Sequence, residues 1–213
     1  MWLLRAQAVQ GRLKIPKIEL NPCQPAKSDS HATPTLEGIV AAYLHDYAEG
    51  EARYLRFYQI QKTLPDAITK AALAALPNGG RFSHQWRIPG LVLVKARDAL
   101  LKLDYSNVRS FAELYEKVAA ALRPIRGIGI LTIYDTAHRL GAYLKLSPEQ
   151  VYLHAGVRVG AKALGLGDWR AKLPMSAFPP AFQRLRPEQV EDCLCIYNRQ
   201  LHAWHRAQDP NRH

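Results

Sequence analysis

The chain has 213 residues and an apolar fraction of 48%, which is typical of one globular domain with or without a tail and excludes a largely disordered chain. Lysine and arginine number 29 against 18 aspartates and glutamates, and the formal net charge is +11. Such an excess favours a polyanionic partner, either nucleic acid or an anionic membrane surface, and does not distinguish between them.

Cysteine usage and the distribution of apolar residues point to a soluble protein of a reducing compartment. The three cysteines are an odd number, which argues against a disulfide framework. The apolar run Trp2–Leu4 is interrupted by Arg5 and is too short for the core of a signal peptide, and no run approaches the length of a membrane span. We therefore expect a cytoplasmic location and no membrane partner.

Residues 1–34 are expected to form a Pro-rich basic N-terminal extension. Prolines at positions 16, 22, 25 and 34 prevent a helix, and the segment has too few apolar residues for a sheet. Its five basic residues against two acidic ones are compatible with an arm that contacts a nucleic-acid backbone. The alternative is a strap that lies on the surface of the folded body.

Residues 35–213 are expected to form a helical domain of the all-α class, because apolar residues recur at three-and-four spacing and no segment alternates with period two. Ser110 followed by Glu113, and Ser147 followed by Pro148 and Gln150, have the pattern of helix-start capping boxes. The helices are predicted to span about 36–60, 65–76, 90–101, 111–122, 130–144, 148–164 and 187–208.

The clearest motif joins two of these helices through the short segment Ile125–Gly129. Glycine allows the main chain to turn tightly and to approach another surface closely. The amides at the start of the following helix then attract a phosphate, because they are unpaired and the helix dipole is positive there. The pattern predicts a helix-hairpin-helix at about 111–144 that contacts the DNA backbone without reading its sequence.

The expected contacts of this hairpin are the main chain of Gly127, Ile128 and Gly129, with Arg123, Arg126 and Thr132 in support. The alternative is a plain connection that only packs two helices together. Buried glycines would favour that alternative.

A second candidate is the segment GGRFSHQWRIP, residues 79–89. Its cations and aromatic ring are what a stacking or backbone-binding site needs, and we expect Arg81, His84, Trp86 and Arg87 to contact nucleic acid. The alternative is a loop that Phe82 and Trp86 anchor in the core, with the arginines and the histidine in solvent.

A third candidate pairs His154 with Arg158, which share one face of the predicted helix 148–164. They are expected either to contact a phosphate or to belong to a buried polar network. No spacing of His, Cys, Asp or Glu predicts a metal site, and no glycine-rich cofactor or nucleotide fingerprint is present, so we expect no cofactor.

Residues 123–166 resemble the helix-hairpin-helix region of the base-excision DNA glycosylases. In that family the hairpin leads into a Val-Asp-x-His segment and an Arg-containing helix that ends at Leu-Gly. The corresponding residues here are Val151, His154, Arg158, Leu164 and Gly165. The resemblance covers 44 of the 213 residues and implies a shared fold fragment and a contact with DNA.

The chain departs from this family at the positions that carry its chemistry. Leu131 occupies the place of the lysine that follows the hairpin in the lyase-type members, and Tyr152 the place of the carboxylate before the histidine. Asp135 is not a replacement by position, and three cysteines are too few for the four-cysteine iron–sulfur loop.

We therefore expect a non-catalytic protein that binds nucleic acid, with the double-stranded DNA backbone as partner. One alternative is a divergent glycosylase or nuclease that uses Asp135, His154 or His84. Another is an interaction or scaffold module with a purely structural hairpin.

Overall fold

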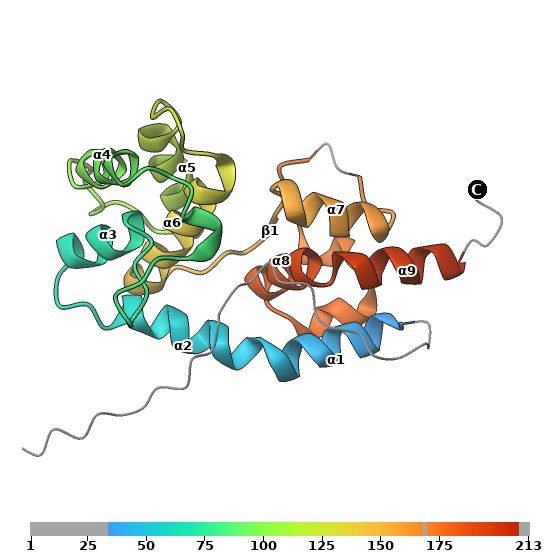
Figure 1. Ribbon diagram of the computed structural model, residues 1–213. Helices are drawn as coiled ribbons and strands as arrows, with labels where there is room; N and C mark the ends of the chain where they lie inside the picture. The colour runs from blue at the N-terminus through green and yellow to red at the C-terminus, as the bar shows by residue number, and fades with distance from the viewer. Residues whose placement is uncertain (1–33, 168–169, 209–213) are drawn as a thin grey trace, which may run out of the picture.

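The computed structural model describes residues 34–167 and 170–208, and the expected N-terminal extension lies outside them except for Pro34. Helices predominate, which confirms the all-α class (Figure 1). None of the described helices is long and apolar enough to cross a membrane. The elements are α1 (Leu36–Asp46), α2 (Ala48–Gln59), α3 (Leu64–Ala72), η1 (Ser83–Gln85), α4 (Gly90–Leu100), α5 (Phe111–Leu122), α6 (Ile130–Leu144), β1 (Val151–Tyr152), α7 (Ala155–Ala163), β2 (Lys172–Leu173), η2 (Met175–Ala177), η3 (Pro180–Arg184), α8 (Pro187–Ile196) and α9 (Asn198–Gln208).

The buried apolar residues form two separate clusters, one in each lobe of the molecule. The first lobe holds α3, α4, α5 and α6, and the second holds α1, α7, α8 and α9 (Figure 1). Helix α2 continues the direction of α1 and leads from the second lobe to the first, where Tyr58 is fully buried. Each lobe therefore has its own core, and the chain crosses between them at α2 and again after α6.

Helix starts follow the sequence where a short polar side chain precedes the apolar stripe. Ser110 Oγ accepts a hydrogen bond from the amide of Glu113 at 3.2 Å, as the predicted capping box requires. The carboxylate of Glu113 accepts from the amide of Arg109 at 2.7 Å rather than from that of Ser110. The predicted helix 36–60 is divided into α1 and α2 by a break at Tyr47.

The predicted helix 148–164 is wrong in its first half, because residues 151–153 are extended and α7 begins only at Ala155. Val151 pairs with Leu173 in a two-stranded antiparallel ladder. Val151 and Leu153 belong to the core of the second lobe, whereas Tyr152 belongs to that of the first. Successive side chains of an extended segment point to opposite sides. This segment can therefore place apolar side chains in both cores, whereas a helix with one apolar face can place them in only one.

Helices α7 and α8 pack closely because α7 presents glycine to its neighbour. A Cβ atom added at Gly160 would overlap the carbonyl oxygen of Leu194 and lie 2.9 Å from its Cα. A Cβ atom added at Gly156 would lie 2.7 Å from Sγ of Cys195, which is the end of a side chain. Only the first of these contacts involves the main chain of α8, which cannot move without moving the helix.

We expect Gly160→Ala to destabilise the protein by about 1–3 kcal/mol, because relief of the overlap requires α7 and α8 to separate. The higher helix propensity of alanine, about 1 kcal/mol, offsets part of this cost. Gly156→Ala is the matched control and is expected to cost less, since the Cys195 side chain can rotate. Urea denaturation measures both free energies, and equal stability of the two variants would contradict this account of the packing.

Candidate nucleic-acid interface

The connection between α5 and α6, residues 123–129, is a tight turn on the surface of the first lobe. Gly127 has a φ of +98°, a left-handed conformation that side-chain-bearing residues rarely adopt. Both Gly127 and Gly129 are exposed, and Ile128 between them packs partly against the core. The turn is thus held by one apolar side chain while its glycine main chain faces outward.

Helix α6 begins without a cap. Gly129 is its N-cap residue, so no side chain accepts a hydrogen bond from the first-turn amides, and no acidic residue lies in the first turn. A Cβ atom added at Gly129 would meet nothing within 4 Å, so the space in front of these amides is open. The first amides of a helix have no intrahelical acceptor, and the partial positive charge at this end is therefore left uncompensated.

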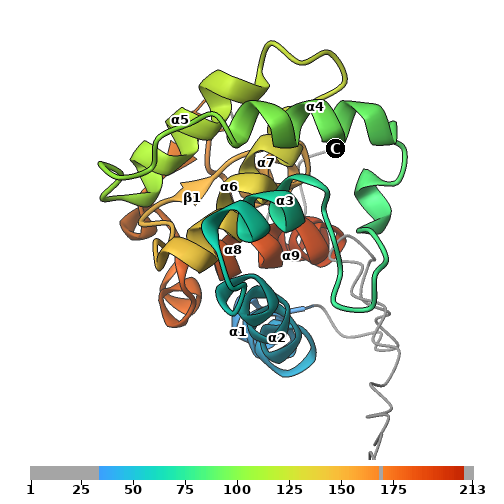
Figure 2. The same cartoon turned by 90° about the vertical axis from the view of Figure 1, so that its left-hand side faces the viewer.

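Helix α4 begins in the same way beside this turn. Pro89 is its N-cap residue, and its first turn has neither a side-chain cap nor an acidic residue. A Cβ atom at Gly127 would lie 3.5 Å from a methyl group of Val92, which places the first turn of α4 against the α5–α6 connection. Figure 2 shows α4 running alongside this connection, with η1 at its N-terminal end.

Residues 79–97 and 117–134 contain no aspartate or glutamate, and their exposed residues are here called the basic face. Asp98 and Glu116 border it, where they pair with Arg97 and Arg123. Arg87, Arg123 and Arg126 are exposed on it, although Arg123 also lies 3.8 Å from the carboxylate of Glu116. Arg81 is half-buried and donates a hydrogen bond to the carbonyl oxygen of Ile88 at 3.0 Å, which closes the loop before α4.

The two aromatic residues of the 79–89 loop have opposite environments. Phe82 is buried, as the core-anchored alternative requires, but the side chain of Trp86 is 71% exposed. His84 is half-buried, and its Nε2 lies 2.7 Å from Oδ2 of Asp135 on α6. Thr132, the other polar residue expected in the site, is buried in the first lobe, and its main-chain oxygen accepts a hydrogen bond from Thr136.

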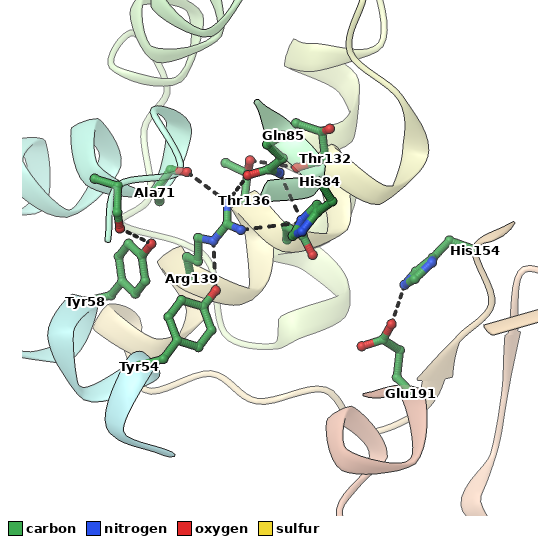
Figure 3. Close-up of polar contacts among 12 residues, drawn as sticks. Tyr54, Tyr58, Ala71, His84, Gln85, Thr132, Thr136, Arg139, His154 and Glu191 are labelled. Carbon is green, nitrogen blue, oxygen red and sulfur yellow. Dashed lines mark hydrogen bonds and ion pairs between the residues drawn. The ribbon is translucent and has the colours of Figure 1, made fainter. Parts of the chain in front are cut away.

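A buried arginine on α6 holds the 79–89 loop in place (Figure 3). Arg139 is 1% exposed, and its Nη1 donates to Oε1 of Gln85 at 3.0 Å. Its Nε donates to the hydroxyl of Tyr54 on α2 at 2.8 Å, and its guanidinium carbon lies 4.4 Å from the centre of the Phe82 ring. Asp135, one turn earlier on α6, accepts from Nε2 of Gln85 at 3.1 Å.

The charges of this network stabilise each other against the cost of burial. Burial alone would raise the pKa of Asp135, but the nearby Arg139 guanidinium and the hydrogen bond from His84 keep that pKa below its usual value. The pKa of Arg139 is raised, because the oxygen atoms of Tyr54, Tyr58 and Asp135 outweigh its desolvation. One sequence feature could have indicated this network: Asp135 and Arg139 are spaced at i and i+4, which places them on the same face of a helix.

His154 and Arg158 lie elsewhere. His154 is 3% exposed and forms an ion pair through Nε2 with Glu191 of α8 (Figure 3). Arg158 is half-buried and donates to the carbonyl oxygen of Leu153 at 3.0 Å. The extended conformation of residues 151–153 makes His154 the N-cap residue of α7, so the histidine belongs to the buried polar network that the sequence left open as an alternative. A phosphate cannot reach it there.

Several buried carboxylates lie between the two lobes, and no pattern in the sequence predicted this cluster. Glu51 of α2 is buried, as are Glu188 and Glu191 of α8. Glu51 accepts a hydrogen bond from the hydroxyl of Tyr43 at 3.3 Å and lies 3.9 Å from the guanidinium of Arg186. Within the described ranges, no group of three or more His, Cys, Asp or Glu residues is arranged to hold a metal ion.

Burial raises the pKa of Glu51 to about 7, and the negative charge of Glu188 adds to the rise. Arg186 and the hydrogen bond from Tyr43 oppose it without cancelling it. Glu51 therefore takes up a proton on folding at neutral pH, and its ionisation at higher pH opposes the folded state.

Comparison of the chain with protein-family models, with curated proteins and with solved structures found no match. The geometry of the basic face and of the network behind it is therefore the basis for the function proposed below.

We expect Arg139→Met to lower the free energy of unfolding by about 3–5 kcal/mol, because it leaves the Asp135 carboxylate buried without its cation. Chemical denaturation measures this loss, with Arg53→Met, an exposed residue of α2, as the control. Adding Asp135→Asn should restore part of the stability. A loss below about 1 kcal/mol for Arg139→Met would mean that the network contributes little to folding.

We expect Glu51→Gln to stabilise the protein at pH 8 and to leave its stability unchanged at pH 4. The folded pKa of about 7 lies above the ordinary value of 4.5, so stability from the bound proton is present below pH 4.5 and is lost as the pH rises through 7. The expected gain at pH 8 is about 1–3 kcal/mol. Glu49→Gln, at an exposed position of the same helix, is the control in urea denaturation at both pH values. A difference between Glu51→Gln and wild type that does not vary with pH would contradict the assignment.

Proposed function

We propose that α5, α6 and the connection between them form a helix-hairpin-helix that binds the backbone of double-stranded DNA without catalysis. The observation that carries this proposal is the exposed Gly127–Gly129 main chain at the uncapped start of α6, within a segment, residues 117–134, that has no acidic residue. Exposed glycines are what a ligand-facing turn requires, whereas buried ones would favour a connection that only packs helices.

Phosphate groups fit this surface for two physical reasons. The first-turn amides of α6 can donate hydrogen bonds to phosphate oxygens, and the helix dipole adds favourable charge at the same point. The exposed Arg126 and Arg123 flank these amides and can neutralise neighbouring phosphates along a strand.

The start of α4 extends the proposed contact. Its first turn lies against the α5–α6 connection, and the exposed Arg87 precedes it in the chain, so we expect this helix start to bind a second point along a phosphate backbone. Arg81 supports the loop through its bond to Ile88. Amide and arginine contacts to phosphate carry no sequence information, so we expect binding with little base preference.

Asp135, one of the three residues named for the enzymatic alternative, is engaged in the buried network. Its Oδ2 already accepts hydrogen bonds from Gln85 and His84, and Arg139 holds it as a carboxylate. Leu131 and Tyr152 occupy the places of the catalytic residues in the glycosylases that this region resembles. Asp135, Gln85 and Arg139 bond to one another, and these contacts have the character of a structural anchor.

We expect the protein to bind duplex DNA with an affinity that falls steeply between about 50 and about 200 mM salt, because bound phosphates release counterions. Gly129→Asp should weaken binding about tenfold while keeping or raising stability. Aspartate is a good N-cap residue, and its charge would occupy the place of the phosphate. Arg126→Gln should reduce the slope of the salt dependence by about one. Fluorescence anisotropy of a labelled duplex measures both effects.

Two matched controls make the test specific. Gly129→Asn has the same size and capping ability without the charge and should bind DNA more tightly than Gly129→Asp. Arg199→Gln removes an exposed charge from α9 in the other lobe and should leave the salt slope unchanged. The proposal fails if the wild-type protein does not bind duplex DNA, or if a folded Gly129→Asp variant binds as tightly as wild type.

A further inference from the structure

Two large apolar side chains project from the basic face. Trp86 is 71% exposed at the end of η1, and Leu91 is 77% exposed in the first turn of α4. Ile130, the first residue of α6, is 47% exposed on the neighbouring helix start. Exposed apolar residues that gather on a charged face mark an interaction surface more often than isolated ones do.

The structure holds Trp86 in its exposed position. Its indole Nε1 donates a hydrogen bond to the carbonyl oxygen of Arg81 at 2.8 Å, which fixes the edge of the ring. The preceding residue, Gln85, is 1% exposed and bonded to Asp135 and Arg139, which fixes the main chain. The indole face is therefore presented to solvent with little freedom to fold back onto the protein.

An aromatic face needs a partner whose own face is uncovered. Inside an intact duplex each base is stacked on both sides, so a protein meets phosphates, sugars and base edges but no base face. At the junction of double-stranded and single-stranded DNA, the last base pair and the first unpaired base each have a face without a neighbour. Aromatic and apolar side chains bind such faces, and the binding does not depend on base identity.

We propose that the basic face binds the junction between double-stranded and single-stranded DNA. Trp86 stacks on the uncovered base, and Leu91 packs beside it. The uncapped start of α6 and Arg126 bind phosphates of the adjoining duplex. This proposal rests on the DNA binding proposed above and names the DNA structure that the same surface prefers.

The positive charge around Trp86 and Leu91 favours DNA as the partner over an apolar segment of another protein. Residues 79–97 contain Arg81, Arg87, Lys95, Arg97 and no acidic residue, and residues 117–134 contain none either. A partner that covers Trp86 and Leu91 must therefore also carry negative charge at close spacing. DNA meets both requirements, since phosphates lie beside every exposed base.

The test compares three labelled DNAs of one sequence in fluorescence anisotropy. One is a duplex closed at both ends by polyether linkers, one is a duplex with a single-stranded overhang, and one is the single strand alone. The wild-type protein should bind the overhang duplex about tenfold more tightly than the closed duplex. Trp86→Ala should abolish this preference, because it should weaken binding of the overhang duplex about tenfold more than binding of the closed duplex. Trp86→Phe should retain part of the preference, since it keeps an aromatic face.

A local readout reports stacking directly. We place 2-aminopurine at the first unpaired position of the overhang, where its fluorescence is quenched by an aromatic ring that stacks on it. Wild type and Trp86→Phe should change this signal, and Trp86→Ala should not. Ile60→Ala, at a 67% exposed position on α2, is the control for loss of exposed apolar surface and should behave as wild type.

The outcomes separate this proposal from the one on which it rests. Equal binding of closed and overhang duplexes by the wild type would overturn the junction preference and leave the backbone contact in place. A preference that survives in Trp86→Ala would also overturn it, as would an equal loss of affinity for both DNAs. Failure to bind any of the three DNAs would overturn both proposals and leave the surface to a protein partner.

Discussion

The structure of the first lobe depends on one buried guanidinium. Arg139 is fully enclosed, and an enclosed charge is tolerated only when hydrogen bonds and an opposite charge surround it. Its partners come from α2, from the 79–89 loop and from its own helix, through Tyr54, Gln85 and Asp135. Because hydrogen bonds are directional, these contacts fix α2 and the 79–89 loop relative to α6 more specifically than apolar packing alone would.

The same helix that carries Arg139 also begins at the exposed glycine turn. α6 therefore has a buried middle that anchors the 79–89 loop and an exposed start that offers its amides to a ligand. The start of α4 follows directly from that loop and contacts the turn through Val92. Two uncapped helix starts are thus set side by side by one polar core. Their unpaired amides cost little at the surface, where water binds them, and remain available for phosphate oxygens.

The junction between the lobes has a different chemistry. Glu51, Glu188 and Glu191 are buried there, and Arg186 and His154 form ion pairs with them. The excess of negative charge in a place of low polarity raises the pKa of Glu51 and opposes its ionisation. The interface that joins the two cores therefore responds to pH, whereas the Arg139 network, with its balanced charges, keeps its ionised state.

The sequence by itself determined the helical class, most helix starts and the tight glycine turn between α5 and α6. These features depend on residues within one or two turns of each other, as in the cap of Ser110 on Glu113 and the positive φ of Gly127. Only the tertiary structure decided that residues 151–153 are extended, that His154 is buried, and that Trp86 is exposed while Phe82 and Gln85 of the same loop are buried. Each of these outcomes depends on contacts between segments that lie far apart in the chain, such as the bond from Arg139 to Gln85. Local periodicity carries no information about such contacts, because the free energy of burying a residue depends on which distant segment covers it.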